Sequence, residues 1–76
     1  MDIKIAYEII FVFQVKLEKD DKPEIKTYIK SIIAEDINVA IDWGRDYILN
    51  KYSNLYLWMN YIGHTILNRE KIYILN

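Results

Sequence analysis

The chain has 76 residues, of which 53% are hydrophobic and 14% aromatic, so we expect one small domain, residues 1–76, with a real core. A net charge of −1 supplies no overall field to attract nucleic acid or an anionic membrane, and the absence of cysteine excludes disulfides and thiolate chemistry. The longest uninterrupted apolar run near the start, Ile9 to Phe13, is too short for a membrane span, and no signal peptide is visible. We therefore expect a cytoplasmic protein.

Residues 3–17 alternate between apolar and mostly polar side chains, with every odd position apolar. A period of two is typical of a β-strand that turns one face to a core. At ~3.3 Å per residue the strand would span roughly 50 Å, whereas a compact domain of this size is only about 30 Å across. The strand is therefore expected to bend, to break at a bulge, or to run past its own domain.

A charged segment from Glu18 to Glu24 follows and reads as a turn before a helix. Asp21 and Glu24 have the spacing of a capping box, and Pro23 suits a first helical turn. The apolar residues that follow recur every three or four positions, which predicts an amphipathic helix over residues 22–34.

Residues 36–51 can be read in two ways. As a helix capped by Asp36 they place their apolar residues on one face. As a strand, residues 37–43 alternate and Gly44 begins a turn. We favour the helix, although a glycine inside it costs about 1 kcal/mol relative to alanine.

Residues 55–62 are rich in aromatic and branched side chains and predict a strand, with Gly63 as a bulge or bend. Residues 65–67 and 71–75 then read as a hairpin around a turn at 68–70. The predicted fold is α+β, in the order β-α-α-β-β, with a three-stranded antiparallel sheet and two helices on one face. The alternative continues a helix from residue 48 to 62 and gives the order β-α-β-α-β.

Ile10 and Val12 interrupt the polar side of the first strand and form an apolar island. Exposed, such a segment invites pairing with another chain. These two residues are the candidate self-association site, and we expect a homodimer through this strand or the outer side of the sheet. The competing interpretation is that another part of the chain covers them.

Three further groups are weighed as binding surfaces. Tyr56 and Trp58 leave an unusually apolar outer side on their strand, and carboxylates on the second helix suit a basic protein groove; together the candidate partner surface is Tyr56, Trp58, Glu35, Asp42 and Asp46. The lysines at positions 22, 26 and 30 recur every four residues on the predicted first helix, as phosphate contacts would. Nearby carboxylates offset most of their charge and no arginine joins them, so Lys22, Lys26 and Lys30 are weak nucleic-acid candidates and nucleic acid is not the expected partner.

No catalytic or metal-binding constellation stands out. Asp42 and Asp46 have metal-compatible spacing, but the chain has one histidine, no cysteine and no glycine-rich phosphate loop. We expect no enzyme activity, no cofactor and no metal. The scarcity of Gly, Pro and Ala beside abundant Ile, Lys, Asn and Tyr suggests AT-rich coding.

The expected function is that of a small protein-interaction module. Short, nearly neutral chains of this kind are common among phage and mobile-element accessory proteins, some of which inhibit a host defence or nucleic-acid-handling protein. The alternatives are a nucleic-acid-binding regulator that uses the lysines with Tyr56 and Trp58, and a subunit of a larger assembly.

Overall fold

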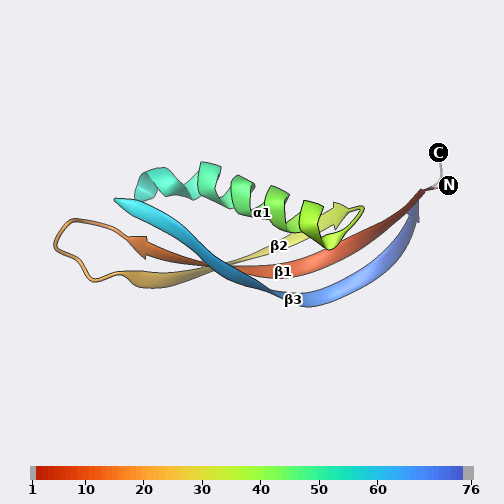
Figure 1. Cartoon of the computed structure of the whole chain (residues 1–76), viewed down its shortest axis with the longest axis horizontal. Helices are drawn as coiled ribbons and strands as arrows, with labels where there is room; N and C mark the ends of the chain where they lie inside the picture. The colour runs from red at the N-terminus through yellow and green to blue at the C-terminus, as the bar shows by residue number, and fades with distance from the viewer. Residues whose placement is uncertain (1, 75–76) are drawn as a thin grey trace.

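The computed structural model describes residues 2–74, which form a three-stranded antiparallel sheet with one α-helix on one face (Figure 1). The sheet has the order β2-β1-β3, so that β1 is the central strand. The predicted α+β class and the three-stranded antiparallel sheet are confirmed, but the structure has one helix instead of the two that were predicted. The elements are β1 (Asp2–Lys16), β2 (Glu24–Ala34), α1 (Ile37–Tyr52), a short 3-10 turn (Ser53–Leu55) and β3 (Trp58–Ile74).

The central strand β1 carries most of the core, as its alternation predicts. The side chains of Tyr7, Ile9, Phe11, Phe13 and Val15 are at most 2% exposed and lie on the face that α1 covers. We call this the inner face of the sheet and the opposite side the outer face. Burial of five large side chains from one strand, each contributing about 1.5–3 kcal/mol, makes β1 the main source of stability.

Residues 22–34, predicted as a helix, form strand β2 instead. Ile32 and Ala34 are buried on the inner face, whereas Ile25, Ile29 and Ile33 are 57–61% exposed on the outer face. Because β2 carries apolar residues on both faces, these residues recur every three or four positions, as they do in an amphipathic helix. This spacing explains the wrong prediction. β-branched residues such as Ile and Thr pack well on a pleated surface, and they dominate this segment.

The predicted helix over 36–51 is confirmed as α1. The carboxylate Oδ1 of Asp36 accepts a hydrogen bond from the backbone N–H of Val39 at 3.0 Å, as an N-cap does. Ala40, Gly44 and Ile48, one turn apart, are the buried residues of α1 and face the sheet. Two of these three are small, so the helix backbone lies close to the strands.

Strand β3 is a single strand that pairs with β1 along its whole length, so the predicted hairpin after Gly63 is wrong. The pairing of β3 with β1 continues across two register shifts. At these shifts Ile62 and Leu67 are inserted in β3 without a partner residue in β1. The first shift lies beside Gly63, where a bulge was predicted. It also turns His64 to the inner face, opposite Phe11, where simple alternation would have placed it on the outer face.

The length of the first strand is accommodated because the whole domain is elongated. The molecule measures 53 × 20 × 14 Å, with a radius of gyration of 14.8 Å, against about 11 Å for a compact chain of this length. β2 pairs with β1 only as far as Ile5, so Asp2–Lys4 and the end of β3 continue as a two-stranded ribbon (Figure 1).

Candidate functional site

The outward side of α1 is the first candidate surface. Helical residues four apart lie almost above one another, so Val39, Trp43 and Tyr47 form one line along the helix. We call these three residues the aromatic ridge. Their side chains are 49%, 53% and 36% exposed, respectively. Asp42 and Asp46 form the neighbouring line, which we call the acidic ridge.

The two rings of the aromatic ridge are held in a fixed arrangement. Trp43 and Tyr47 stack with their centroids 5.1 Å apart and their planes at 12°. Lys30 of β2 places its Nζ 4.4 Å from the centre of the Tyr47 ring, and Lys51 lies 5.6 Å from it. A hydrogen bond with Tyr47 raises the pKa of Lys51. Cations beside its ring therefore anchor Tyr47, and Tyr47 supports the exposed indole.

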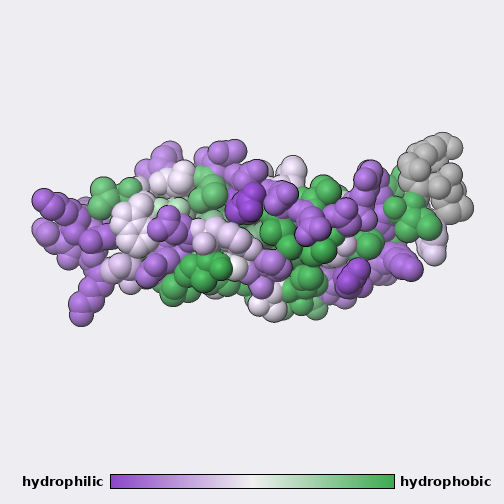
Figure 2. All heavy atoms as spheres, in the orientation of Figure 1, coloured by the Kyte–Doolittle hydropathy of each residue, from purple (hydrophilic) through white to green (hydrophobic). Residues whose placement is uncertain are grey.

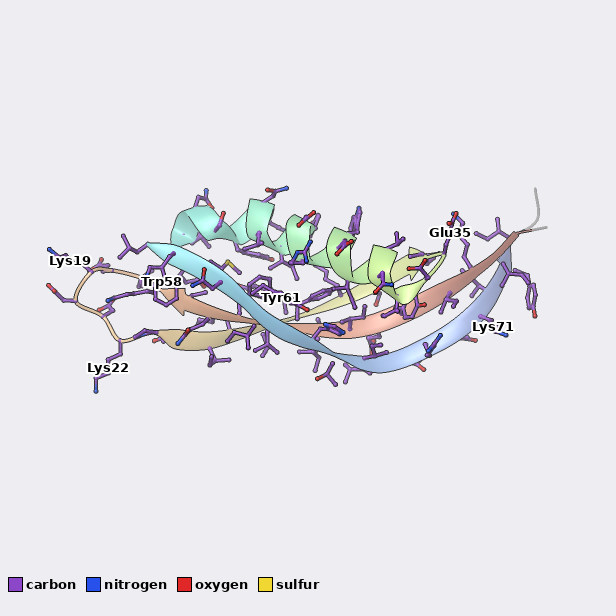
Figure 3. The ribbon with its side chains drawn as sticks, in the orientation of Figure 1. Lys19, Lys22, Glu35, Trp58, Tyr61 and Lys71 are labelled. Carbon is purple, nitrogen blue, oxygen red and sulfur yellow. The ribbon has the colours of Figure 1, made fainter. Side chains whose placement is uncertain are left out.

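The acidic ridge contains two of the predicted partner residues. Both carboxylates lie beside Arg45, whose guanidinium is 3.3 Å from Asp42 Oδ1 and 3.3 Å from Asp46 Oδ1. Exposed pairs of this kind add little stability, so the carboxylates stay accessible to a partner. Glu35 is exposed at the other end of the predicted surface, just before the start of α1 (Figure 3).

Tyr56 and Trp58 do not join the helix carboxylates in one surface. Tyr56 is half-buried and packs against the core. Burial and the neighbouring Tyr56 raise the pKa of Tyr28 to about 12. Trp58 pairs with Lys16 on the outer face and lies far from Glu35 (Figure 3). The five predicted partner residues are therefore spread over both sides of the molecule.

The predicted lysine row is absent because residues 22–34 are not helical. Lys22 lies in the loop before β2, and Lys26 and Lys30 lie on the inner face of the strand. Lys26 is 3.6 Å from Glu24, and Lys30 is engaged with the Tyr47 ring. The geometry on which the nucleic-acid alternative depended is therefore not formed.

Ile10 and Val12 lie in the middle of the outer face, as predicted. Ile10 is flanked by Ile29 and Thr65 in the two neighbouring strands. Hydrophobic side chains, drawn in green in Figure 2, gather along the lower edge of the molecule, below the sheet. Among residues 2–74, no element covers this face, so internal cover of the island, the competing interpretation, is not found.

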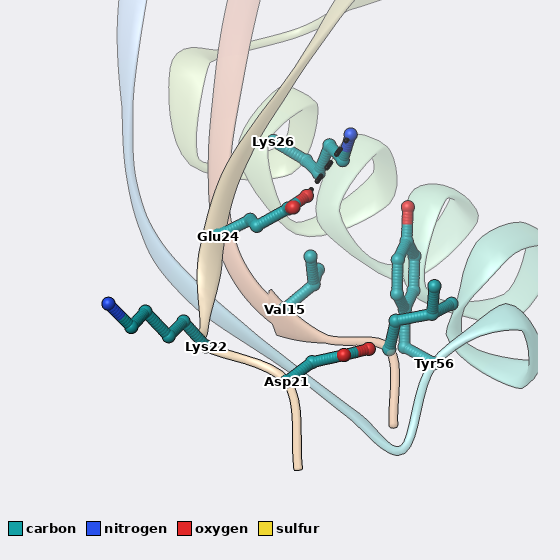
Figure 4. Close-up of a pocket in the computed structure, with 7 residues that line it drawn as sticks. Val15, Asp21, Lys22, Glu24, Lys26 and Tyr56 are labelled. Atoms are coloured by element: carbon teal, nitrogen blue, oxygen red, sulfur yellow. Dashed lines mark ion pairs between the residues drawn. The ribbon is translucent and has the colours of Figure 1, made fainter. Parts of the chain in front are cut away.

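An open cavity of about 400 Å³ lies at the hairpin end of the sheet (Figure 4). Its charged groups are solvated or paired within the loop: Asp21 Oδ2 accepts a hydrogen bond from the N–H of Glu18, and Glu24 pairs with Lys26. Nothing here resembles a carboxylate desolvated for acid–base catalysis. The cavity is lined by Val15, Leu17, Asp21, Lys22, Glu24, Lys26 and Tyr56.

A hydrogen-bonded pair of polar side chains lies on the inner face of β3. The hydroxyl of Tyr61 is 2.6 Å from Nδ1 of His64, and the two rings are nearly parallel. The exposed pair is a local contact between two residues that flank the bulge. Within residues 2–74 there is no group of three or more His, Cys, Asp or Glu side chains that could hold a metal ion.

Comparison with known proteins gives no relative for this chain: no family model, no curated protein and no solved structure matches it. Within residues 2–74, no helix has both the length and the hydrophobicity needed to cross a membrane.

Proposed function

We propose that this chain is a small, non-enzymatic protein-interaction module that binds a protein partner through α1. The observation that carries the proposal is the exposed indole of Trp43, 53% accessible and stacked on Tyr47. Trp and Tyr are enriched among the residues that dominate binding energy, because they bury a large area and lose little side-chain freedom. A tryptophan already held in place loses even less on binding.

The chemistry of the partner follows from the two ridges. The indole of Trp43 would enter an apolar pocket, and Asp42 and Asp46 would meet Lys or Arg side chains at its rim. Complementary charge of this kind speeds association and orients the partner. A protein that handles nucleic acid carries such basic grooves, because it must bind phosphates.

The biological role we propose is that of a phage or mobile-element accessory protein that binds and inhibits a host defence or nucleic-acid-handling protein. The small size, the near-neutral charge and the composition of the chain support this role. The lysines give no comparable support for a nucleic-acid-binding regulator, since they do not form a row on a helix: Lys22 lies in the loop before β2, and Lys26 and Lys30 lie on the inner face of that strand.

The test is a pulldown from lysates of candidate bacterial hosts with the wild type, Trp43→Ala and Asp46→Lys. We expect the wild type to recover one stoichiometric protein, Trp43→Ala to lose it, and Asp46→Lys to recover less of it. The control is Lys71→Ala, since Lys71 lies near the end of β3, away from α1 (Figure 3). Failure to recover any stoichiometric partner, or equal recovery by Trp43→Ala, would refute the proposal.

A further inference from the structure

The outer face is a second surface, separate from α1, and it is apolar over its central part. Side chains that pair with Ile10 and Val12 come from both neighbouring strands. Five aliphatic residues of this face are about half exposed or more: Ile25, Ile29, Ile33, Ile62 and Leu67. At roughly 100 Å² of exposed area each, they present roughly 500 Å² of apolar surface, as much as the largest patch on a typical monomer.

This area approaches what a stable protein contact needs. A standard interface buries about 800 Å² on each partner. The half-buried Ile10 and Val12 and the threonines between the isoleucines add to the apolar side chains. Sheets that pack face to face lie about 10 Å apart and interdigitate through alternating residues of this type.

Two charged residues of β1 flank the central part of the outer face. Glu8 lies on one side of it and Lys16 on the other, and the outward-facing β1 residues between them are uncharged. The residues that pair with this central stretch in β2 and β3 are also uncharged. Farther along β1, beyond Glu8, the outer face also carries Lys4 and Glu70. The central part is therefore apolar, with a negative charge directly on one side of it and a positive charge on the other.

We infer that a second copy of this chain covers the outer face, with its strands antiparallel to those of the first. A two-fold axis perpendicular to the strands at Val12 places Lys16 over Glu8 of the second copy, and Glu8 over its Lys16. The same axis places Ile25 over Ile29 of the second copy and Val12 over its own equivalent. An axis along the strands would instead place Lys16 against Lys16 and Glu8 against Glu8, which like-charge repulsion disfavours.

A competing arrangement would pair two copies edge to edge through β2. Experiment can distinguish the face-to-face dimer from the edge-to-edge dimer because Glu8 and Lys16 belong to β1, the central strand. They take no part in an edge contact through β2. The inferred dimer also leaves α1 of each copy facing outward, so it is independent of the proposed binding through Trp43.

The experiment is molar mass by light scattering at low salt over a range of concentrations. The wild type should give twice the 9.2 kDa of one chain. Lys16→Glu and Glu8→Lys should each weaken dimerisation at least about tenfold, because each creates two like-charge contacts per dimer. The double variant Lys16→Glu/Glu8→Lys exchanges the charges and should restore the dimer. Lys19→Glu, in the hairpin loop, is the control and should match the wild type.

Ile29→Lys adds a second, independent check. Its side chain is 61% exposed, so the substitution should leave the fold intact by circular dichroism while it gives monomers. A monomeric wild type, or a dimer that neither single charge reversal weakens, would overturn the inference. A dimer that both single variants weaken and the double variant does not restore would overturn the antiparallel geometry. None of these outcomes bears on the pulldown with Trp43→Ala.

Discussion

Gly44 of α1 lies directly over the ring of Phe11 in the centre of β1. A Cβ built on this glycine would collide with the ring of Phe11 and would lie 2.7 Å from Cδ1 of Ile32. Phe11 is fully buried, so its ring has no free space into which it could move. The glycine that weakened the helix prediction is therefore what allows the helix to approach the sheet.

Gly44→Ala should destabilise the protein although alanine favours helices. The gain in helix propensity, about 1 kcal/mol, is smaller than the typical cost of overpacking a core, about 1–3 kcal/mol. Urea unfolding should show a lower midpoint. Gly63→Ala is the matched control, because nothing lies within 4 Å of the Cβ that it would add. A Gly44→Ala variant more stable than the wild type would contradict the packing described here.

Asp36→Ala should cost about 1 kcal/mol of stability, since it removes the N-cap of α1. The bond lost is the one from the N–H of Val39 to Oδ1 at 3.0 Å. Asp36→Asn keeps an acceptor oxygen and should stay within a few tenths of a kcal/mol of the wild type. If both variants lose the same amount, the charge rather than the cap is the stabilising feature.

The protein should lose stability in strong alkali through Tyr28. Burial first, and then Tyr56, raise its pKa to about 12, against about 10 in the unfolded chain. The folded state therefore favours the neutral phenol. The contribution of Tyr28 to the free energy of unfolding is complete below pH 10 and is lost as the pH rises towards 12.

Urea midpoints measured between pH 8 and 11 should fall for the wild type and fall less for Tyr28→Phe. Some pH dependence should remain in that variant, because burial also raises the pKa of Tyr61, with Arg45 acting in the opposite direction. An identical decline in both proteins would show that Tyr28 is not responsible.

Lys30 and Tyr47 should be energetically coupled. A cation 4.4 Å from a ring centroid at an exposed site contributes about 0.5–1 kcal/mol. The double-mutant cycle of Lys30→Ala and Tyr47→Ala, followed by urea unfolding, measures this coupling. A cycle that closes at zero would mean that Lys30 does not hold Tyr47 in place, which leaves its stacking on Trp43 and its contact with Lys51.

The helix and the strand that each have one clearly buried face were predictable from the sequence. The alternation in β1 and the capped helix after Asp36 each combine a clear period with a local signal, and both are present. Met59 and Tyr61 also lie on the inner face, as their strand parity indicates.

The errors arise where a strand lacks one clear buried face. In β2 the outer isoleucines Ile25, Ile29 and Ile33 are spaced by four, which suits a helical turn as well as one side of a strand. In β3 the polar run Asn68–Glu70 looks like a turn, but it pairs with residues 6–8 of β1 in the three-stranded part of the sheet, on an edge strand where all three residues are exposed.

The candidate site was predictable only in part. The sequence predicts Asp42 and Asp46 as partner residues but does not single out Trp43 and Tyr47. Their exposure depends on which side of α1 packs on the sheet, and the small residues Ala40 and Gly44 decide that. Small residues at two of the three buried positions, beside a line that carries two aromatic residues, are the signal that could have revealed the ridge.

The pairing of β1 with β3 has a consequence for folding kinetics. Asp2 pairs with Ile74, so this ladder joins opposite ends of the described chain, whereas β1 and β2 are joined by a short loop. Closing the larger loop carries a greater entropic cost before any contact offsets it. We therefore expect the β1–β2 hairpin to form early and β3 to dock last, with the rate of folding set by the search of the final strand for its register.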